Sequence, residues 1–156
     1  MKKIFLISLF FVFLINSCSK QQIQKTQNSV TPALPNDISA LTPEQVVVLY
    51  FKSWNIKKYD IMYSLISDGF KKIEPTAITF DDFQLYMSSF FETGSGINVV
   101  EAREEYQNEK GAGVKYKIKI IEKDGTKKEF INAYTLKKKS DRWKLIHPYG
   151  EHIDES

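Results

Sequence analysis

Polar residues at alternate positions of the predicted strands are the side chains of this chain best suited to chemistry. If the two strands that flank Lys110 pair across it, Glu104 lies opposite Tyr116 in a wall of apolar residues. A carboxylate in such a wall would have a raised pKa and could act as a general base. The alternative, which we favour, places Glu104 at an open rim, solvated or hydrogen-bonded to a tyrosine. The polar residues expected on this inner face are Glu104, Tyr106, Tyr116, Tyr134 and His147.

His147 shares the alternation of Trp143 and Leu145, but Pro148 follows it directly and places the histidine at a strand end. We therefore expect a structural or exposed histidine rather than a catalytic one. The sequence carries no nucleophile motif, no glycine-rich phosphate loop and no cysteine–histidine cluster. We predict no catalytic residue, no metal site and no cofactor.

Amphipathic segments predict the helices that position these strands. Thr42-Pro43-Glu44-Gln45 is a capping box with proline at the first helical position. A second, short helix is predicted to begin at Asp60 and to stop at Ser67-Asp68-Gly69, and a third to span Thr79 to Phe91. The apolar face of the first helix comprises Val46, Val47, Tyr50, Phe51 and Trp54.

From Ile97 onward, apolar and polar residues alternate, and this period of two predicts antiparallel strands. Gly111-Ala112-Gly113 and Asp124-Gly125 are the predicted turns. A third strand follows from about Lys128 to Leu136, and a fourth from Arg142 to His147. In the first strand, the alternation assigns Val100 to the same face as Ala102 and Glu104.

The register of the third strand has two interpretations. A two-residue turn at Asp124-Gly125 pairs Ile118 with Ile131, whereas a bulged three-residue turn pairs Ile118 with Phe130. A slip of one residue exchanges the two faces of a strand. The larger side chains of the set containing Phe130 favour the bulged turn, although the sequence leaves both registers open. The two sets are Phe130, Asn132 and Tyr134, and Ile131, Ala133 and Thr135.

This order of elements, which closes on Arg142-Trp143-Lys144-Leu145-Ile146, resembles the nuclear transport factor 2-like superfamily over roughly residues 41–150. The resemblance implies an α+β fold in which a strongly curved four-stranded meander wraps around helices as a cone. It also implies, in many members, a pocket at the wide end and a dimer through the sheet. Enzymatic members include ketosteroid isomerase-like and dehydratase-like proteins, with an acid–base residue inside the cone. The residues that could line such a pocket here are Tyr50, Trp54, Glu104, Tyr106, Tyr116, Tyr134 and His147.

The start of the chain is typical of an export signal. Met1-Lys2-Lys3 is positively charged, and Ile4–Ile15 is apolar except for Ser8. This run is too short to span a membrane. Ile15-Asn16-Ser17-Cys18 resembles the bacterial lipobox, which implies a diacylglyceryl thioether on Cys18 and cleavage before it. Cys18 is the only cysteine in the sequence.

The chain is therefore predicted to have three parts. Residues 1–17 are a lipoprotein signal peptide, residues 18–40 a lipidated, flexible tether rich in Gln, Asn, Ser, Thr and Pro, and residues 41–153 a single α+β domain. Loss of Lys2 and Lys3 takes the net charge from +3 to +1.

Charge is unevenly distributed within the predicted domain. Asp81–Glu109 contains seven acids and one base, whereas Lys110–Lys144 contains twelve bases and four acids. Cross-strand pairing with Glu101 and Glu105 explains part of the basic excess. The remaining bases could favour anionic lipid headgroups or polyanionic envelope polymers. The outward-facing lysines expected to pair are Lys115, Lys117 and Lys119.

We expect a noncatalytic domain that is anchored to the membrane through lipidated Cys18, on the extracytoplasmic side of the bacterial cell envelope. The expected partner is a small ligand or another envelope protein, and not nucleic acid. Two alternatives remain. In the first alternative, the domain is a small-substrate enzyme of isomerase or hydrolase type. In the second, it is a dimeric assembly protein whose interface is the sheet.

Overall fold

The computed structural model describes residue 38 and residues 40–148. The predicted signal, most of the predicted tether and the end of the predicted domain lie outside these residues. Helix α1 (Pro43–Asn55) begins as the sequence predicts. Thr42 Oγ1 accepts the backbone N–H of Gln45 at 3.3 Å, and the Gln45 side chain accepts the backbone N–H of Thr42 at 2.9 Å. The capping box is therefore closed from both sides.

The helices after α1 differ in part from the prediction. Lys58, not Asp60, precedes the second helix, and Asp60 lies in its first turn. The second helix ends at Leu65, just before the predicted stop, and Ser67 then begins a further helix, because its hydroxyl accepts the N–H of Phe70 at 2.9 Å. Thr79 caps the last helix as predicted. These elements are α2 (Tyr59–Leu65), α3 (Asp68–Ile73), the 3₁₀ helix η1 (Pro75–Ala77) and α4 (Phe80–Thr93).

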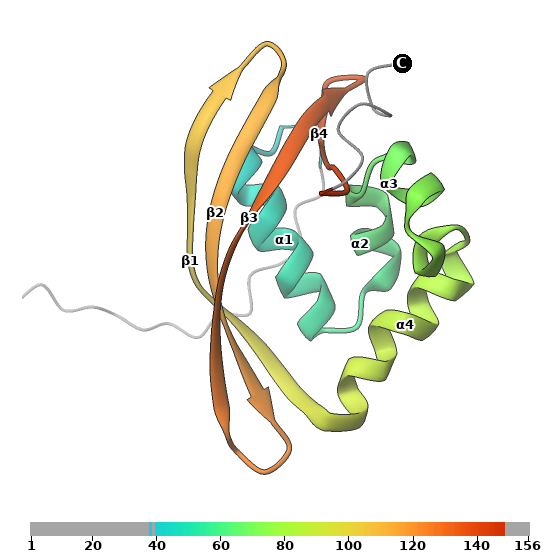
Figure 1. Ribbon diagram of the computed structural model, residues 1–156, viewed down its shortest axis with the longest axis vertical. Coiled ribbons are helices and arrows are strands. Elements are labelled where there is room, and N and C mark those ends of the chain that lie inside the picture. The colour runs from blue at the N-terminus through green and yellow to red at the C-terminus, as the bar shows by residue number, and fades with distance from the viewer. Residues whose placement is uncertain (1–37, 39, 149–156) are drawn as a thin grey trace, which may run out of the picture. The chain divides into compact units, whose positions relative to one another are not determined.

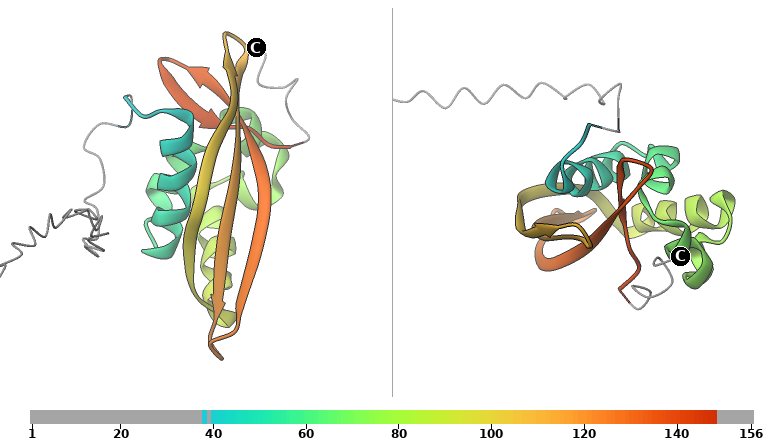
Figure 2. Two further views of the ribbon diagram at one scale, coloured as in Figure 1. Left: turned by 90° about the vertical axis from the view of Figure 1, so that its left-hand side faces the viewer. Right: turned by 90° about the horizontal axis from the view of Figure 1, so that it is seen from above.

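Four antiparallel strands form one sheet in the order β1-β2-β3-β4. Figure 1 shows the β1–β2 and β3–β4 turns at one end of the sheet and the β2–β3 turn at the other. Figure 2 shows the sheet twisting, with α1 against one of its faces. The α+β class and the curved sheet are thus confirmed. The strands are β1 (Gly94–Asn108), β2 (Gly111–Glu122), β3 (Lys127–Lys139) and β4 (Arg142–Leu145).

The turn between β1 and β2 comes before Gly111-Ala112-Gly113, the segment that was predicted to form it. Asn108 pairs with Gly111, and Asn108 Oδ1 accepts the backbone N–H of Lys110 at 2.8 Å. An asparagine that bonds the backbone two residues on makes a tight turn by itself, which leaves Gly111 free to open β2. The predicted pairing across Lys110 is therefore wrong, and Glu104 lies opposite Val114.

Three register shifts interrupt the pairing of β1, and the last two change which of the side chains discussed here face the helices. The register shifts between Val99 and Glu101, and again just before Tyr106. An extra residue in one strand reverses the alternation beyond it. Val99 therefore packs against the core, while Val100, predicted to face inward, is exposed. Tyr106 lies over Gly113 on the outer face, where a Cβ added to the glycine would be 2.3 Å from the tyrosine ring.

The bulged register of β3 is confirmed. Ile118 pairs with Phe130, and the N–H of Glu122 donates to the carbonyl of Thr126 at 2.9 Å, which closes a loop of Lys123-Asp124-Gly125. The N–H of Gly125 donates to the carbonyl of Glu122 at 3.0 Å. Gly125 has a φ of 87°, a left-handed conformation that glycine adopts readily and that three-residue hairpin loops require.

The core lies between α1, α2 and the inner face of the sheet. β4 returns beside β3, and Ile66 bridges to Leu145 in parallel, which ties the helical segment to the last strand. No helix within residues 40–148 is long and apolar enough to cross a membrane. Fully buried residues of this core include Val46, Val47, Met62, Leu65, Ala112, Val114, Leu136 and Leu145.

Candidate functional site

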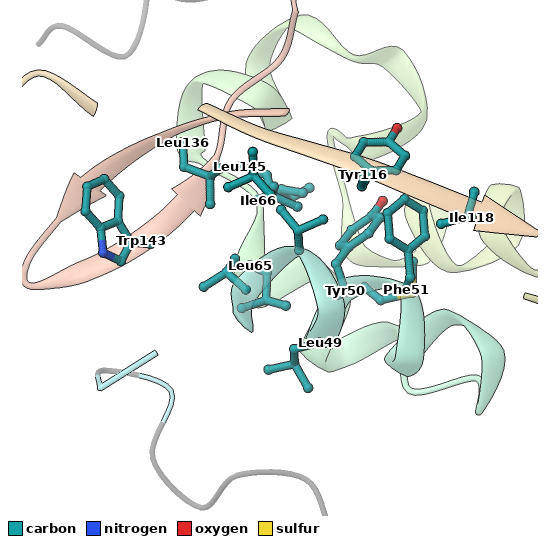
Figure 3. Packing of buried hydrophobic residues seen from close by; sticks show 14 of the residues in the cluster. Leu49, Tyr50, Phe51, Leu65, Ile66, Tyr116, Ile118, Leu136, Trp143 and Leu145 are labelled. Carbon is teal, nitrogen blue, oxygen red and sulfur yellow. The ribbon is translucent and has the colours of Figure 1, made fainter. Parts of the chain in front are cut away.

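Four aromatic rings meet between α1 and the inner face of the sheet. Tyr50 and Phe51 project from α1 toward Tyr116 on β2 (Figure 3). Tyr116 stacks on Tyr134 of β3 with their ring centroids 5.0 Å apart, and Phe51 lies 4.8 Å from Tyr116. Tyr50 meets Tyr134 edge-on at 6.1 Å. We call these four residues the aromatic cluster. Tyr116 and Tyr134 meet because the bulged register makes them diagonal neighbours on adjacent strands.

The hydroxyl groups of the aromatic cluster are neutral at neutral pH. Burial raises the pKa of Tyr50, and neighbouring Tyr116 and Tyr86 add to the increase. Burial also raises the pKa of Tyr134 well above its usual value. The pKa of Tyr116 is raised by burial as well, although a hydrogen bond with Tyr134 offsets part of the effect. The cluster therefore offers apolar ring faces and uncharged donors and acceptors.

Trp54 extends the aromatic cluster toward α4. Its ring lies 6.5 Å from that of Phe51 and 4.9 Å from that of Phe90. Its Nε1–H donates to the carbonyl of Met87 at 2.9 Å. Trp54, which the sequence assigns to the apolar face of the first helix, is partly buried and joins α1 to α4.

Strand β3 leads from the aromatic cluster to solvent. Tyr134 is partly buried, Asn132 is exposed, and Phe130 is 46% exposed although it shares the inner face with Ile118. Along the inner face of β3, the aromatic side chains therefore change from partly buried at Tyr134 to solvent-exposed at Phe130.

Glu104 lies on β1, close to the start of α1. It is partly exposed, and Tyr116, its predicted partner, lies opposite Ala102. The backbone N–H of Glu104 donates to Glu44 Oε1 at 2.5 Å, at the start of α1. Glu104 therefore has an acidic neighbour on α1 in addition to apolar Val114, which lies opposite it on β2.

Replacement of Glu104 by glutamine is expected to change the free energy of unfolding by less than about 0.5 kcal/mol, because the carboxylate is partly solvated. Urea unfolding at neutral pH measures this, with Glu101→Gln on the same strand as the exposed control. A gain above about 1 kcal/mol in Glu104→Gln alone would reveal a desolvated charge and favour an acid–base role.

His147 lies in a separate cluster beside α3. Its Nε2 is 3.4 Å from Glu74 Oε2, and its ring meets Phe70 edge-on at 5.0 Å. Glu74 Oε1 accepts the Thr76 hydroxyl at 2.8 Å. This hydrogen bond is the main reason that the pKa of Glu74 is lowered, and His147 contributes to the same direction. His147 is buried and has a carboxylate partner, so its contacts are those of a structural residue.

The stability of the domain is expected to fall in acid partly because of Glu74. A carboxyl whose pKa is lower in the folded state stabilises the fold above its unfolded pKa, and this contribution is lost as the pH falls through the folded pKa. Glu74→Gln is therefore expected to reduce the loss of stability between about pH 5 and pH 3. Urea midpoints across this range provide the measurement, and an unchanged acid slope would contradict the proposed linkage.

The outer face of the sheet carries charge pairs that differ from the predicted ones. Lys117 and Lys119 contact Glu129 of β3 at 2.8 and 3.0 Å. The sequence predicts pairing with Glu101 and Glu105 of β1. The third-strand register, which places Glu129 opposite Lys119, explains the difference.

Of the other predicted site residues, Tyr106 faces outward and Cys18 lies outside the described residues. Within residues 40–148, no three potential metal-binding side chains cluster closely enough to hold a metal ion. Sequence reasoning missed Phe51 as a member of the site, although its place on the apolar face of the first helix was a usable signal. It also missed Glu74, for which the sequence offers no comparable signal, because its partner His147 is distant along the chain.

Neither the family models nor the curated proteins include a match to this chain. Solved structures do match. A SEC-C motif containing protein from Rhodopseudomonas palustris has a TM-score of 0.52 and 11% identity, with 68% of this chain and 76% of that chain covered.

A proposed aromatic ring hydroxylase from Novosphingobium aromaticivorans has a TM-score of 0.50 and 10% identity, with 72% and 87% covered. A proposed polyketide cyclase from Pseudomonas putida has a TM-score of 0.48 and 10% identity, with 74% and 98% covered. At such identities the first two matches show a shared fold and nothing about activity.

Proposed function

We propose that this chain is a noncatalytic, lipid-anchored binding domain of the bacterial cell envelope with a nuclear transport factor 2-like fold. Its ligand is a small, flat, uncharged molecule that binds where the aromatic cluster opens along β3. The observation that carries this proposal is the continuous inner face from buried Tyr116, through partly buried Tyr134, to exposed Phe130.

The chemistry of this face fits such a ligand. Binding sites for small molecules are mostly apolar and aromatic, with a few polar groups that fix orientation. Aromatic rings favour stacked and edge-on contacts with another ring. Because the tyrosine hydroxyls are neutral, they can hydrogen-bond an uncharged oxygen or nitrogen without requiring a counter-charge.

The positions of the acid–base candidates support a noncatalytic role. Glu104 lies beside Glu44 at the start of α1, and His147 contacts Glu74 beside α3. Catalysis by a general acid and base requires both groups within hydrogen-bond reach of one substrate. The separate positions of Glu104 and His147 favour a binding role over proton transfer.

Fluorescence titration with N-phenyl-1-naphthylamine, a neutral aromatic probe, tests the proposal on the chain from Ser19 onward. Saturable enhancement is expected. Phe130→Ala is expected to weaken binding about three- to tenfold, in line with the contribution of one aromatic contact. Ile131→Ala is the matched control, because Ile131 is the next residue, is 63% exposed and faces outward.

Equal losses in the two variants, or no saturable binding, would contradict the proposed site. Thermal unfolding of each variant separates loss of binding from loss of folding.

A second candidate function is assembly of a homodimer through the outer face of the sheet. Val100, Tyr106 and Ile131 are large apolar side chains that remain exposed there. Ile131→Glu is then expected to convert a dimer into a monomer, as measured by analytical ultracentrifugation. A wild-type chain that sediments as a monomer would remove this candidate.

A further inference from the structure

Asn132 interrupts the row of aromatic side chains that runs along the inner face of β3. It lies between Tyr134 and Phe130 in the alternation of that strand, and it is exposed. In the sheet it pairs directly with Tyr116 of β2, so the two side chains project from the same face with Cβ atoms about 4.5–5.5 Å apart. An amide group is therefore placed among three of the rings that form the proposed binding face.

A backbone hydrogen bond fixes the orientation of this amide. The N–H of Ala133 donates to Asn132 Oδ1 at 2.8 Å. Ala133 lies outside residues 136–139, the part of β3 that pairs with β4, so the asparagine oxygen takes the place of a strand partner for this N–H. Only the oxygen of the amide can accept such a bond, because the nitrogen carries two donors and no acceptor. The oxygen of Asn132 is therefore already engaged.

The two N–H groups of the Asn132 amide remain as donors. They make no hydrogen bond to another residue within the part of the chain that the structure describes. Because the side chain is exposed, water accepts these bonds when no ligand is bound, and a ligand that displaces the water without accepting them loses affinity. The tyrosine hydroxyls of the aromatic cluster can both donate and accept, so they impose no such requirement.

We propose that Asn132 sets the specificity of the binding face, and that the ligand is a flat, uncharged molecule with an acceptor oxygen, such as a ring carbonyl, where it meets the Asn132 amide. This inference rests on the proposed function and narrows its ligand class. A hydrocarbon of the same shape would leave the two donors without a partner, and a ligand that presents an N–H there would set donor against donor. The face should therefore discriminate among molecules of one size and shape.

Three tricyclic probes of nearly equal shape separate these cases. Fluorenone carries a carbonyl oxygen on its central ring, carbazole an N–H and fluorene a methylene group. Each competes with N-phenyl-1-naphthylamine for the chain from Ser19 onward, and the loss of fluorescence gives its dissociation constant. The quantity compared is the fluorene constant divided by the fluorenone constant in each variant, because differences in the apolarity of the two probes then cancel between variants.

Asn132→Ala is expected to lower this ratio about two- to tenfold, the usual effect of losing one neutral hydrogen bond. Asn132→Asp keeps an oxygen that can accept the N–H of Ala133 and removes both donors, so it separates the ligand contact from the backbone bond. This variant is expected to bind carbazole more tightly than fluorenone, the reverse of the wild-type order. Asn98→Ala is the matched control, because Asn98 is also an exposed strand asparagine but pairs with Lys119 on the outer face.

A ratio that falls in Asn132→Ala and not in Asn98→Ala, with the order reversed in Asn132→Asp, supports the inference. An unchanged ratio in Asn132→Ala, or an equal fall in Asn98→Ala, would overturn it and leave the proposed function standing if N-phenyl-1-naphthylamine still binds saturably. Absence of saturable binding of that probe to the wild type would overturn both. Thermal unfolding verifies that each variant is folded.

Discussion

Replacement of Phe51 by alanine is expected to lower the free energy of unfolding by about 3–5 kcal/mol, the usual cost of removing a large buried ring. Phe51 is 2% exposed and lies at the centre of the aromatic cluster, with ring contacts to Tyr116, Tyr134 and Trp54. Alanine would leave these rings facing a cavity that they could fill only by leaving their present positions. The effect should therefore combine lost burial with lost packing.

Urea unfolding of the chain from Ser19 onward measures this loss. Leu85→Ala is the control, because Leu85 is also a large apolar residue on a helix but is 74% exposed, and a change below about 0.5 kcal/mol is expected there. Phe51→Leu should give an intermediate loss because it keeps part of the volume. A loss below about 1 kcal/mol in Phe51→Ala would mean that the four rings do not pack as described.

Replacement of Cys18 by alanine is expected to abolish acylation and to release the chain from the membrane. The thiol is the only group in the sequence that can form the thioether implied by Ile15-Asn16-Ser17-Cys18. Two or more acyl chains give stable anchoring, whereas a single chain gives marginal binding. Loss of the thioether should therefore abolish membrane retention almost completely.

Metabolic labelling with a fatty-acid analogue, followed by membrane fractionation, tests the role of Cys18. Ser19→Ala is the matched control, because it alters the next residue and leaves the thiol in place. Equal labelling of the wild type and Cys18→Ala would remove the lipoprotein interpretation. Release of Ser19→Ala as well would point to the surrounding segment and not to the cysteine.

Local signals in the sequence predicted the ends of the best-defined elements. The capping box at Thr42 and the cap at Thr79 hold because each side chain bonds to a backbone only three residues away. Gly125 fixed the β2–β3 hairpin for a similar reason, since its conformation depends on the turn itself. Ser67 was recognised as the boundary at which the second helix ends, but not as the cap of the next helix.

The pairing of β1 was not predictable, because it depends on where extra residues are accommodated. A bulge leaves no clear pattern in the sequence, and each of the last two of the three register shifts in β1 reverses the faces of the residues beyond it. Val100 and Tyr106 were placed on the wrong face for this reason. Tyr116 and Tyr134, on strands paired without such shifts, do share the inner face.

The candidate site was predicted in part. Tyr50 and Tyr116 could be placed on inner faces from helix and strand periodicity, whereas Tyr134 joins them only in the bulged register, which the sequence favoured without deciding. Contacts that join distant segments, such as Glu74 with His147, follow from the packing of α3 against the end of the sheet. The basic excess of Lys110–Lys144 was visible in the sequence, whereas the strand pairing that brings Lys144 beside Lys137 was not.

The shortness of β4 has a consequence for the behaviour of the protein at high concentration. β4 covers residues 136–139 of β3, and no other described strand pairs on that side of residues 127–134. Exposed backbone edges of this kind template intermolecular β-sheets, and lysines on the edge discourage them. Lys127 and Lys128 supply such protection at one end of the segment. Fibril growth should therefore begin at Phe130–Ala133, and the outward-facing amides there should exchange with deuterium sooner than those of β2.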